Sequence, residues 1–504
     1  MLVSTFAIAV CGLVYELLAG TVSSYLLGDS VYQFSIVIGL FMAAMGFGSY
    51  LSRFVTEHLT DAFVWTQLLV GIAGGFSAIV LFFAFSHLDN YEPFLVLLSV
   101  VIGTLIGVEI PLVIRMLRDY QVLKLNVSNV FTVDYIGALL ASLLFPLVLV
   151  PHLGLIRTGL FFGLLNTLVA CVAMYTFRAE LKSFRWAAVF GAAVAATLAI
   201  SFAGAPWFTD RINARLYAGE ILHAESTPYQ QIVLTRSQGI VNLFLNGALQ
   251  FSSIDEYRYH EALVHPALAL SRHRERVLVL GGGDGLAVRE ILKHPSVEHI
   301  TLVDIDPAIT RLFRTNHLLT ALNRGALLDP KVDVVNADAA KFLEQTDKLF
   351  DVVIIDLPDP HDIPMSRLYT RWFYTLVRAR MSAHGTLVTQ ATSPLYARKA
   401  YWSIVETISA TSSPTQPAQP LHVMPYHAYV PTFGDWGFVL AATRRLDLDA
   451  VSLDGIATQF LTAETAARLA FFPPDMRRIP VEVNTLEDHA LPGYYEAGWA
   501  KWYR

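Results

Sequence analysis

The first 205 residues contain very few charged side chains. They hold 8 Lys/Arg and 10 Asp/Glu, whereas the following 299 residues hold 28 Lys/Arg and 32 Asp/Glu. A soluble domain carries about 25% charged residues. The sequence therefore predicts a membrane-type part, residues 1–205, followed by a part with ordinary soluble composition.

Seven stretches in the first part are long and apolar enough to cross a bilayer, which requires about 20 mostly apolar residues. They lie at about 2–27, 31–52, 62–86, 93–117, 127–150, 154–177 and 184–205. We expect a multi-pass α-helical membrane domain of about seven helices, in the cell membrane, with the lipid bilayer as a partner.

Four ionisable side chains fall inside these stretches: Glu16, Glu109, Arg115 and Asp134. Charged groups within a membrane are costly and usually face a bundle interior or water. They are interpreted either as a path or site for cations, or as groups that pair, are protonated, or lie near an interface.

Overall charge and cysteine content exclude several functions. The formal net charge is −6, so nothing resembles a basic surface for nucleic acid. The two cysteines, Cys11 and Cys171, are far apart in apolar segments and form no metal or disulfide pattern. No metal site is expected.

From residue 206 onward, short apolar runs alternate with helix-like segments, a pattern typical of βαβ units and a parallel sheet. The runs lie at 276–280, 300–305, 331–335, 350–355 and 385–389. Before them, alternating runs flank Asn246-Gly247, which is typical of a hairpin turn. We therefore expect a linker and small β subdomain over 206–255, then a Rossmann-like, methyltransferase-type doubly wound α/β domain over 256–504.

A glycine-rich turn follows the first of these strands, in VLVLGGGDG at 277–285. Asp304 and Asp306 follow the second strand, about 20 residues later, where an acid can accept hydrogen bonds from ribose hydroxyls. Asp338 follows the third strand and could accept a bond from an adenine amino group. Together they predict an adenosine pocket, with no P-loop present.

More carboxylates follow the same strand ends. Asp356 and Asp359 lie in IIDLPDP, and Asp284 lies in the glycine turn. Converging carboxylates attract a cationic substrate and raise one another's pKa, which suits a general base. The alternative is that an Asp-Pro pair only begins a turn.

Several ordered segments resemble the spermidine synthase family of polyamine aminopropyltransferases. They are ESTPYQQI at 225–232, LNGALQFSSIDEYRYHEALVHPAL at 245–268, VLVLGGGDGLAVREILKHPSVEHITLVDIDP at 277–307, NADA at 336–339 and DVVIIDLPDP at 351–360. The segments at 390–402 and 430–438 resemble its membrane-anchored, multi-pass branch.

The resemblance implies transfer of an aminopropyl group from decarboxylated S-adenosylmethionine to a diamine, usually putrescine. The products are spermidine and methylthioadenosine, and no permanently bound cofactor is needed. It implies Asp356 as the catalytic proton acceptor and Tyr259, His260, Asp284 and Asp359 as amine-binding residues. It assigns the donor to Gln230, Gly281, Gly283, Asp304, Asp338, Ala339 and Pro364.

This sequence departs from the family pattern at three places. Asp304 replaces the more usual Glu, Asn246 replaces the usual Asp, and the loop after DLPDP, at 361–364, is one residue longer. Because that loop closes on the acceptor amine, the departure bears on which diamine is used.

Two alternative functions remain at this stage: an S-adenosylmethionine-dependent methyltransferase on the same fold, and a polyamine carrier or sensor with a non-catalytic soluble domain. Soluble relatives commonly self-associate, so a homo-oligomer is an expectation. Three alternate loops of the membrane part hold seven Lys/Arg, which favours an external enzyme domain. The donor is cytosolic, however, and on that ground we expect a cytoplasmic one.

Overall fold

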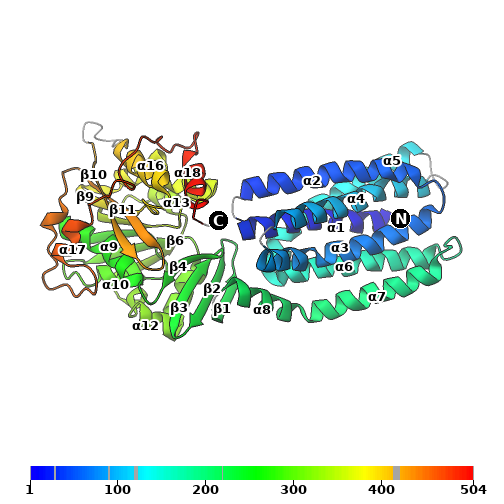
Figure 1. Ribbon diagram of the computed structural model, residues 1–504, viewed down its shortest axis with the longest axis horizontal. Coiled ribbons are helices and arrows are strands. Elements are labelled where there is room, and N and C mark those ends of the chain that lie inside the picture. Colours follow the sequence, from blue (N-terminus) through cyan, green and yellow to red (C-terminus); the bar gives the residue numbers. More distant parts are fainter. Residues whose placement is uncertain are drawn as a thin grey trace. The chain divides into compact units, whose positions relative to one another are not determined.

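The computed structural model describes residues 2–27, 30–88, 91–117, 123–217, 219–411 and 420–502. The chain divides into two compact units, Met1–Ile221 (unit 1) and Leu222–Arg504 (unit 2) (Figure 1). Each unit has its own apolar core.

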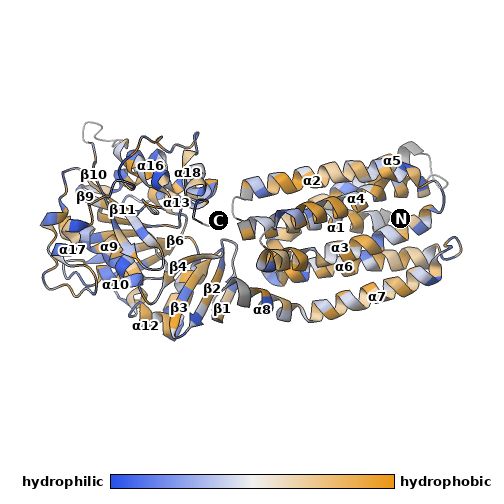
Figure 2. Cartoon of the chain, viewed as in Figure 1, coloured by the Kyte–Doolittle hydropathy of each residue, from blue (hydrophilic) through white to orange (hydrophobic). Residues whose placement is uncertain are grey.

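Unit 1 is a bundle of long apolar helices. They are α1 (Leu2–Leu27), α2 (Ser30–Leu51), α3 (Leu59–His87), α4 (Glu92–Met116), α5 (Leu123–Leu144), α6 (Val150–Thr176) and α7 (Phe184–Ala203), followed by the shorter α8 (Ala205–Leu216). The bounds lie close to the seven apolar stretches expected from the sequence. Figure 2 shows that hydrophobic residues predominate in α1 to α7.

The segment Val127–Thr176 is one apolar helical stretch of 50 residues. At 1.5 Å per residue it would be about 75 Å long, more than twice the hydrocarbon thickness of a bilayer. It is interrupted by a π-helical turn, Phe145–Leu149, and by Gly154, whose φ is 73°. α1 packs against both halves of this segment, α5 and α6.

Small residues let these helices approach closely. A Cβ atom on Gly107 of α4 would lie 2.1 Å from the carbonyl oxygen of Met45 in α2, and one on Gly163 of α6 would lie 2.6 Å from that of Gly71 in α3. Close backbone contact of this kind is how helices associate when both are apolar.

Unit 2 begins with a four-stranded antiparallel sheet in the order β1-β2-β3-β4. Its strands are β1 (Glu220–Ser226), β2 (Gln231–Ser237), β3 (Ile240–Leu245) and β4 (Ala248–Ser252). Asn246 and Gly247 both have positive φ, 48° and 82°, and join β3 to β4. These are the angles of a type I′ turn, so the expected hairpin is confirmed.

The larger sheet has seven strands in the order β10-β11-β9-β8-β5-β6-β7. They are β5 (Arg276–Gly281), β6 (His299–Asp304), β7 (Val332–Asn336), β8 (Phe350–Asp356), β9 (Met381–Gln390), β10 (His422–Val430) and β11 (Gly434–Ala442). The first five are parallel, and β11 runs antiparallel to β9 and β10. The expected doubly wound, methyltransferase-type sheet is confirmed, but sequence analysis did not predict β10 and β11.

Helices cover both faces of this sheet, which explains its continuous apolar strands. In β5, Val277 and Val279 belong to the core on one face, whereas Leu278 and Leu280 belong to the core on the other. The helices are α9 (Glu256–Leu270), α10 (Leu286–Ile291), α11 (Pro307–Thr315), α12 (His317–Leu322), α13 (Ala339–Gln345), α14 (Ile363–Ser366), α15 (Arg371–Ala379), α16 (Arg398–Ser409), α17 (Ala463–Arg468) and α18 (Ala490–Trp499).

Candidate active site

The glycine turn lies directly against the end of strand β8. Gly281 at the end of β5 pairs with Asp356 at the end of β8, and Gly281 and Gly282 have φ of 82° and 64°. A Cβ on Gly281 would lie 2.1 Å from the Asp356 carbonyl oxygen, and one on Gly282 would lie 3.0 Å from its carboxylate. Only glycine combines a positive φ with so close a contact to a neighbouring strand. The glycine turn and Asp356 therefore lie side by side at the carboxyl edge of the sheet.

Asp304 organises the next strand end. Its two carboxylate oxygens accept hydrogen bonds from the backbone N–H of Gly283, at 3.0 Å, and of Asp306, at 2.9 Å. Burial raises the pKa of Asp304 to about 6, although these two hydrogen bonds oppose the shift. The carboxylate is thereby fixed beside the glycine turn, and each oxygen retains capacity to accept from a ligand hydroxyl.

Asp306 connects the small sheet to this edge. It is buried, and one of its oxygens accepts hydrogen bonds from Thr227, at 2.8 Å, and from the side-chain amide of Gln230, at 3.0 Å. Its other oxygen caps α11 through the N–H of Ala308. Gln230, a predicted donor contact, is thus held at the edge of the sheet by Asp306.

Asp338 lies two residues beyond the end of β7 and caps α13. One oxygen accepts from the Lys341 N–H at 3.0 Å, and the other pairs with Arg367 at 2.6 Å. Although desolvation opposes it, these bonds and the positive charge of Arg367 lower the pKa of Asp338. Ala339 is the first residue of α13, whereas Pro364 is exposed in α14, three residues before Arg367.

The three predicted amine-site carboxylates lie around Tyr259 and His260 of α9. The hydroxyl of Tyr259 donates to Asp356 at 2.7 Å. Burial raises the pKa of this hydroxyl, and the negative charges of Asp356 and Asp359 add to the rise. Burial raises the pKa of Asp356, while His260 and Tyr259 oppose that rise. Burial also raises the pKa of Asp284 to about 6, despite nearby His260.

His260 is the positive counterpart of this acidic group. Burial would lower its pKa, but Glu256, 2.8 Å away, raises it to about 9, and Asp284 and Asp356 add to the effect. Arg289 in turn holds both oxygens of Glu256 at 2.8 and 2.9 Å. His260 is therefore an imidazolium near neutral pH. In the described ranges, no group of three or more His, Cys, Asp or Glu could hold a metal ion.

Asp359 is supported from the end of β9. Thr392 donates to it at 3.1 Å, and burial raises its pKa to about 6 against the effects of Tyr495, Gln390 and Thr392. Gln390 and Tyr369 both bond the Leu357 carbonyl, at 2.7 and 3.1 Å, and so fix the chain between Asp356 and Asp359.

The supporting residues Glu256, Arg289, Gln390 and Thr392 were not predicted from the sequence. Glu256 and Arg289 lie in the quoted segments DEYRYHE and GLAVRE, beside the predicted His260 and Asp284. The available signal was that an acidic residue, Glu256, lies close in sequence to His260 and a basic residue, Arg289, lies close to Asp284. Thr392 had no comparable signal, because its role depends on an unusual backbone angle.

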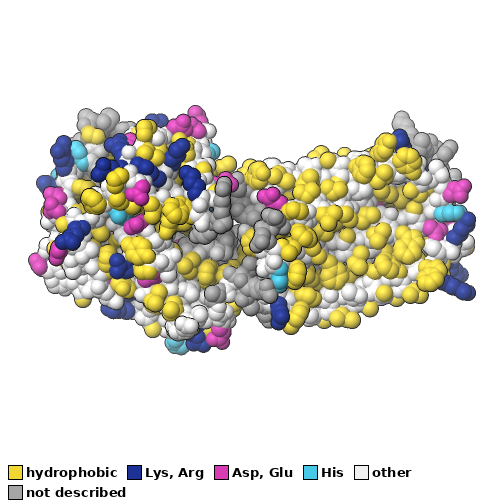
Figure 3. All heavy atoms as spheres, viewed as in Figure 1, with side chains coloured by type: hydrophobic (Ala, Val, Ile, Leu, Met, Phe, Trp, Pro, Cys, Tyr) yellow, Lys and Arg dark blue, Asp and Glu magenta, His cyan; other side chains and the backbone are white. Residues whose placement is uncertain are grey.

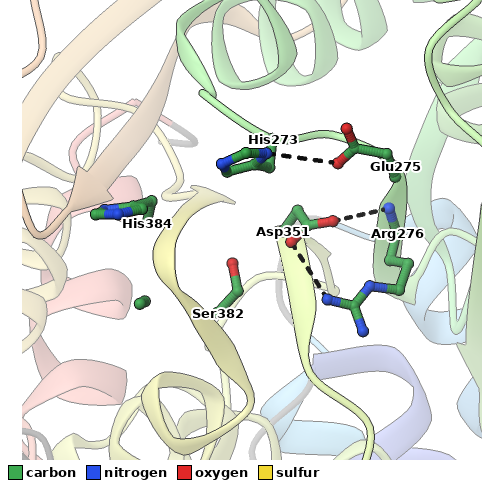
Figure 4. A pocket seen from close by; sticks show the side chains of 7 residues that line it. His273, Glu275, Arg276, Asp351, Ser382 and His384 are labelled. Atoms are coloured by element: carbon green, nitrogen blue, oxygen red, sulfur yellow. Dashed lines mark hydrogen bonds and ion pairs between the residues drawn. The ribbon is translucent and has the colours of Figure 1, made fainter.

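A hollow at the opposite edge of the sheet differs in character (Figure 4). It is lined by Arg276 and Asp351, at the beginnings of β5 and β8, and by neighbours including His273 and His384. Asp351 accepts from the Arg276 N–H at 3.1 Å and lies 3.6 Å from its guanidinium. Ligands of open α/β sheets bind at the carboxyl ends of the strands, which places the candidate site at the other edge.

Comparison with known proteins agrees with this geometry. The Spermine/spermidine synthase domain model matches residues 256–450. Polyamine aminopropyltransferase 2 of Ralstonia nicotianae is 48% identical over 99% of this chain and 98% of its own length. The chain belongs to the polyamine aminopropyltransferase family.

A second relative and one solved structure are also similar to this chain. Polyamine aminopropyltransferase of Leptospira interrogans is 44% identical over 99% of this chain and 98% of its own length. The crystal structure of spermidine synthase from Thermotoga maritima shares 24% identity, with a TM-score of 0.45, over 50% of this chain and 85% of that one. The protein is an aminopropyltransferase.

Proposed function

We propose that this aminopropyltransferase uses a diamine acceptor, putrescine, and that Asp356 accepts the proton of the attacking amine. The observation that carries the proposal is the 2.7 Å hydrogen bond from Tyr259 to Asp356, next to His260, whose pKa the charges of Asp284 and Asp356 help to raise. The charge of Asp359 also acts on Tyr259. A dication with two separated ammonium groups complements several neighbouring carboxylates.

The reaction needs a neutral amine held in line with a carbon beside a sulfonium. The amine nitrogen forms a bond to that carbon, the carbon–sulfur bond breaks, and sulfur keeps the electron pair as a neutral thioether. The nitrogen then gives one proton to Asp356. The leaving group requires neither an acid nor a metal, so the work of the site is to bind, orient and deprotonate.

The other predicted residues divide between the two substrates. Asp304 would accept the ribose hydroxyls, and Asp338 would accept the adenine amino group, with Gln230, Gly281, Gly283, Ala339 and Pro364 completing the donor side. Asp284 would pair with the ammonium of the aminopropyl arm, and Asp359, with Tyr259 and His260, would position the acceptor.

A product assay tests the proposal. Purified protein is given decarboxylated S-adenosylmethionine with each of several diamines, and spermidine and methylthioadenosine are quantified. We expect putrescine to give the highest kcat/KM, and Asp356→Asn to lower kcat by about 10²- to 10⁴-fold, the usual contribution of a general base. Preference for another amine would exclude putrescine, and an unchanged Asp356→Asn rate would exclude the base.

We also propose that unit 1 crosses a lipid bilayer. Six helical segments have the length and hydropathy required, and the longest, Val127–Thr176, has 50 residues and is long enough to cross twice. Large apolar side chains such as Met42, Leu139 and Ile200 are 62–73% exposed on the bundle. Figure 3 shows hydrophobic side chains covering the visible face of these helices, with charged ones near the ends. Exposed apolar surface of this extent is typical of contact with lipid.

We propose a cytoplasmic location for the enzyme domain, because its donor is a cytosolic metabolite. The basic residues of the alternate loops favour the opposite orientation. A reporter enzyme that is active only outside the cytoplasm, fused after Arg504, distinguishes the two orientations. It would give no signal if the aminopropyltransferase domain is cytoplasmic.

A further inference from the structure

The connection between α6 and α7 forms a hollow of about 570 Å³ at one end of the helical bundle (Figure 1). The residues that line it are Arg178, Lys182, Phe184, Arg185 and Trp186. Three of these side chains are cationic, and the other two are large and aromatic. A hollow of this composition suits an anionic group that is attached to an apolar body.

The cations of the hollow are not neutralised by acidic side chains. Across the described ranges, Arg178, Lys182 and Arg185 form no ion pair with an Asp or a Glu. The ammonium group of Lys182 instead donates to His58 Nε2 at 2.8 Å. The guanidinium groups of the two arginines therefore remain available to an anion from outside the chain.

Two acids of this end of the bundle bind the loop or its neighbours. Asp61 of α3 accepts hydrogen bonds from the N–H groups of Lys182, at 3.1 Å, and Ser183, at 2.8 Å, and from the Ser183 hydroxyl. Glu180 accepts a hydrogen bond from the Thr60 hydroxyl of α3 at 3.3 Å. These contacts fix the loop on α3, so the hollow is held in one shape.

The beginning of α7 adds a further attraction for an anion. Arg185 and Trp186 lie in the first turn of this 20-residue helix, where the backbone N–H groups have no acceptor within the helix. The positive end of the helix dipole lies at the same place. The charge of the arginines and the field of the helix therefore act in the same direction.

Exposed apolar side chains continue from the hollow along both helices. Tyr175 and Val172 of α6 are 76% and 51% exposed, and Trp186 and Val189 of α7 are 76% and 66% exposed. The guanidinium of Arg178 lies 5.9 Å from the centre of the Tyr175 ring. Trp and Tyr at the end of an exposed apolar surface are typical of the level of lipid headgroups. A free inorganic anion would make no use of this surface.

We propose that the hollow binds the phosphate-bearing headgroup of an anionic lipid, with its acyl chains against the exposed apolar surfaces of α6 and α7. Arg178 and Arg185 donate charge-assisted hydrogen bonds to the phosphate oxygens. A single Lys or Arg near a membrane surface contributes about fivefold to the affinity for anionic lipid. This proposal rests on the proposed crossing of a bilayer by unit 1, and it does not depend on the acceptor amine.

Basic loop residues also orient a membrane protein, but orientation depends on their charge and not on their exact positions. Arg53 is therefore a matched control. It lies in the connection between α2 and α3, its guanidinium lies 3.8 Å from the centre of the Tyr50 ring, and it does not line the hollow. Arg53→Gln removes the same charge from the bundle and leaves the hollow intact.

Lipid titration tests the site. Full-length protein in detergent is titrated with dioleoylphosphatidylglycerol or dioleoylphosphatidylcholine, and bound lipid is measured by native mass spectrometry. We expect wild type to bind the anionic lipid about tenfold more tightly or better, and Arg178→Gln and Arg185→Gln each to reduce this preference about fivefold. Arg53→Gln should leave it unchanged. Equal effects of all three substitutions, or no preference in wild type, overturn the proposal.

Competition distinguishes a lipid from a free anion. Inorganic phosphate should displace no more phosphatidylglycerol than sodium chloride does at the same ionic strength. Trp186→Ala removes apolar surface without removing charge, and it should weaken binding of the lipid several-fold. Specific displacement by inorganic phosphate, together with unchanged lipid binding by Trp186→Ala, would identify the hollow as a site for inorganic anions and contradict the proposal.

Insertion into the membrane is measured separately. Membranes that contain the full-length protein are washed with alkaline carbonate, which removes proteins that do not cross the bilayer. Release of the protein contradicts the proposed crossing and the lipid site with it. Retention of the protein, combined with no preference for phosphatidylglycerol in the titration, contradicts the lipid site alone.

Discussion

The carboxylate of Glu256 holds the imidazole of His260 one turn further along α9, with a distance of 2.8 Å from Oε2 to Nδ1. Arg289 binds both oxygens of Glu256, so the carboxylate of Glu256 cannot rotate away from His260. His260 thereby stays positively charged beside Asp284 and Asp356. The electrostatics of the site thus depend on a residue with no direct access to substrate.

Substituting Glu256 should therefore change the pH dependence of catalysis. In Glu256→Gln the pKa of His260 falls, so Asp356 loses a stabilising positive charge and its pKa rises. For Asp284, the loss of the negative charge of Glu256 opposes the same effect. The acidic limb of the kcat/KM profile should move to higher pH, with a loss of about tenfold or more at pH 7. The measurement is a pH–rate profile from pH 5 to 9.

Glu261→Gln is the matched control on the same helix. Glu261 is fully buried, but it accepts hydrogen bonds only from the backbone N–H groups of Gln459, Phe460 and Leu461. It should lower the unfolding temperature without moving the acidic limb. If both variants moved the acidic limb equally, the shift would reflect a general loss of packing around α9 and not the charge of His260.

Tyr259→Phe should also move the acidic limb upward. The Tyr259 hydroxyl donates to Asp356 at 2.7 Å and stabilises its ionised form. Hydrogen bonds to charged groups contribute about 1.5–3 kcal/mol, so kcat/KM at pH 7 should fall about tenfold or more. Tyr401→Phe is the comparison, because that buried hydroxyl donates to the backbone carbonyls of Tyr426 and Phe438 and its loss should leave the limb in place. A limb that stays in place for Tyr259→Phe would contradict the role of the Tyr259–Asp356 bond.

Thr392 has a backbone conformation that β-branched residues rarely adopt, with φ of 56°. Its N–H donates to Gln390 at 3.0 Å, and its carbonyl accepts from Gly437 at 2.7 Å. The surroundings thus enforce a strained residue whose hydroxyl reaches Asp359. Thr392→Val should raise KM for the amine several-fold with little change in kcat. Thr392→Ser, which keeps the hydroxyl, should have a KM close to that of wild type. Steady-state kinetics with varied amine concentration test this prediction.

Most of this architecture follows from local sequence patterns. Apolar length predicted the helices of unit 1, and strand-length runs predicted β5 to β9. The glycine turn indicated the neighbourhood of Asp356, because parallel strands end at one edge. Strands β10 and β11 were not predicted, since Pro425 in β10 and Gly434 and Gly437 in β11 interrupt their apolar pattern. Thr392 and the pairing of Glu256 with Arg289 are tertiary features, which periodicity does not encode.

The donor preference should depend on Asp284. Ordinary S-adenosylmethionine carries a carboxylate on the arm that Asp284 is proposed to meet, and like charges there disfavour it. Asp284→Asn should narrow the preference for the decarboxylated donor by about tenfold. Both donors are supplied together and products are counted; equal discrimination by wild type and variant would refute the idea.

The raised pKa of Asp359 implies that its ionised carboxylate lowers the stability of the folded protein at pH values above that pKa. An aspartate in the unfolded chain has a pKa near 3.9, whereas burial raises that of Asp359 to about 6 in the folded protein. Between these values the folded state binds more protons, so this group's contribution to stability falls as pH rises from about 4 to 6 and stays low above it. Asp359→Asn removes the buried charge and keeps an acceptor for Thr392. It should raise Tm by a few degrees at pH 8 and leave it almost unchanged at pH 4, while lowering amine affinity. Thermal unfolding of both proteins at the two pH values tests this, and an equal or lower Tm for the variant at pH 8 would show that the carboxylate is not held at a cost.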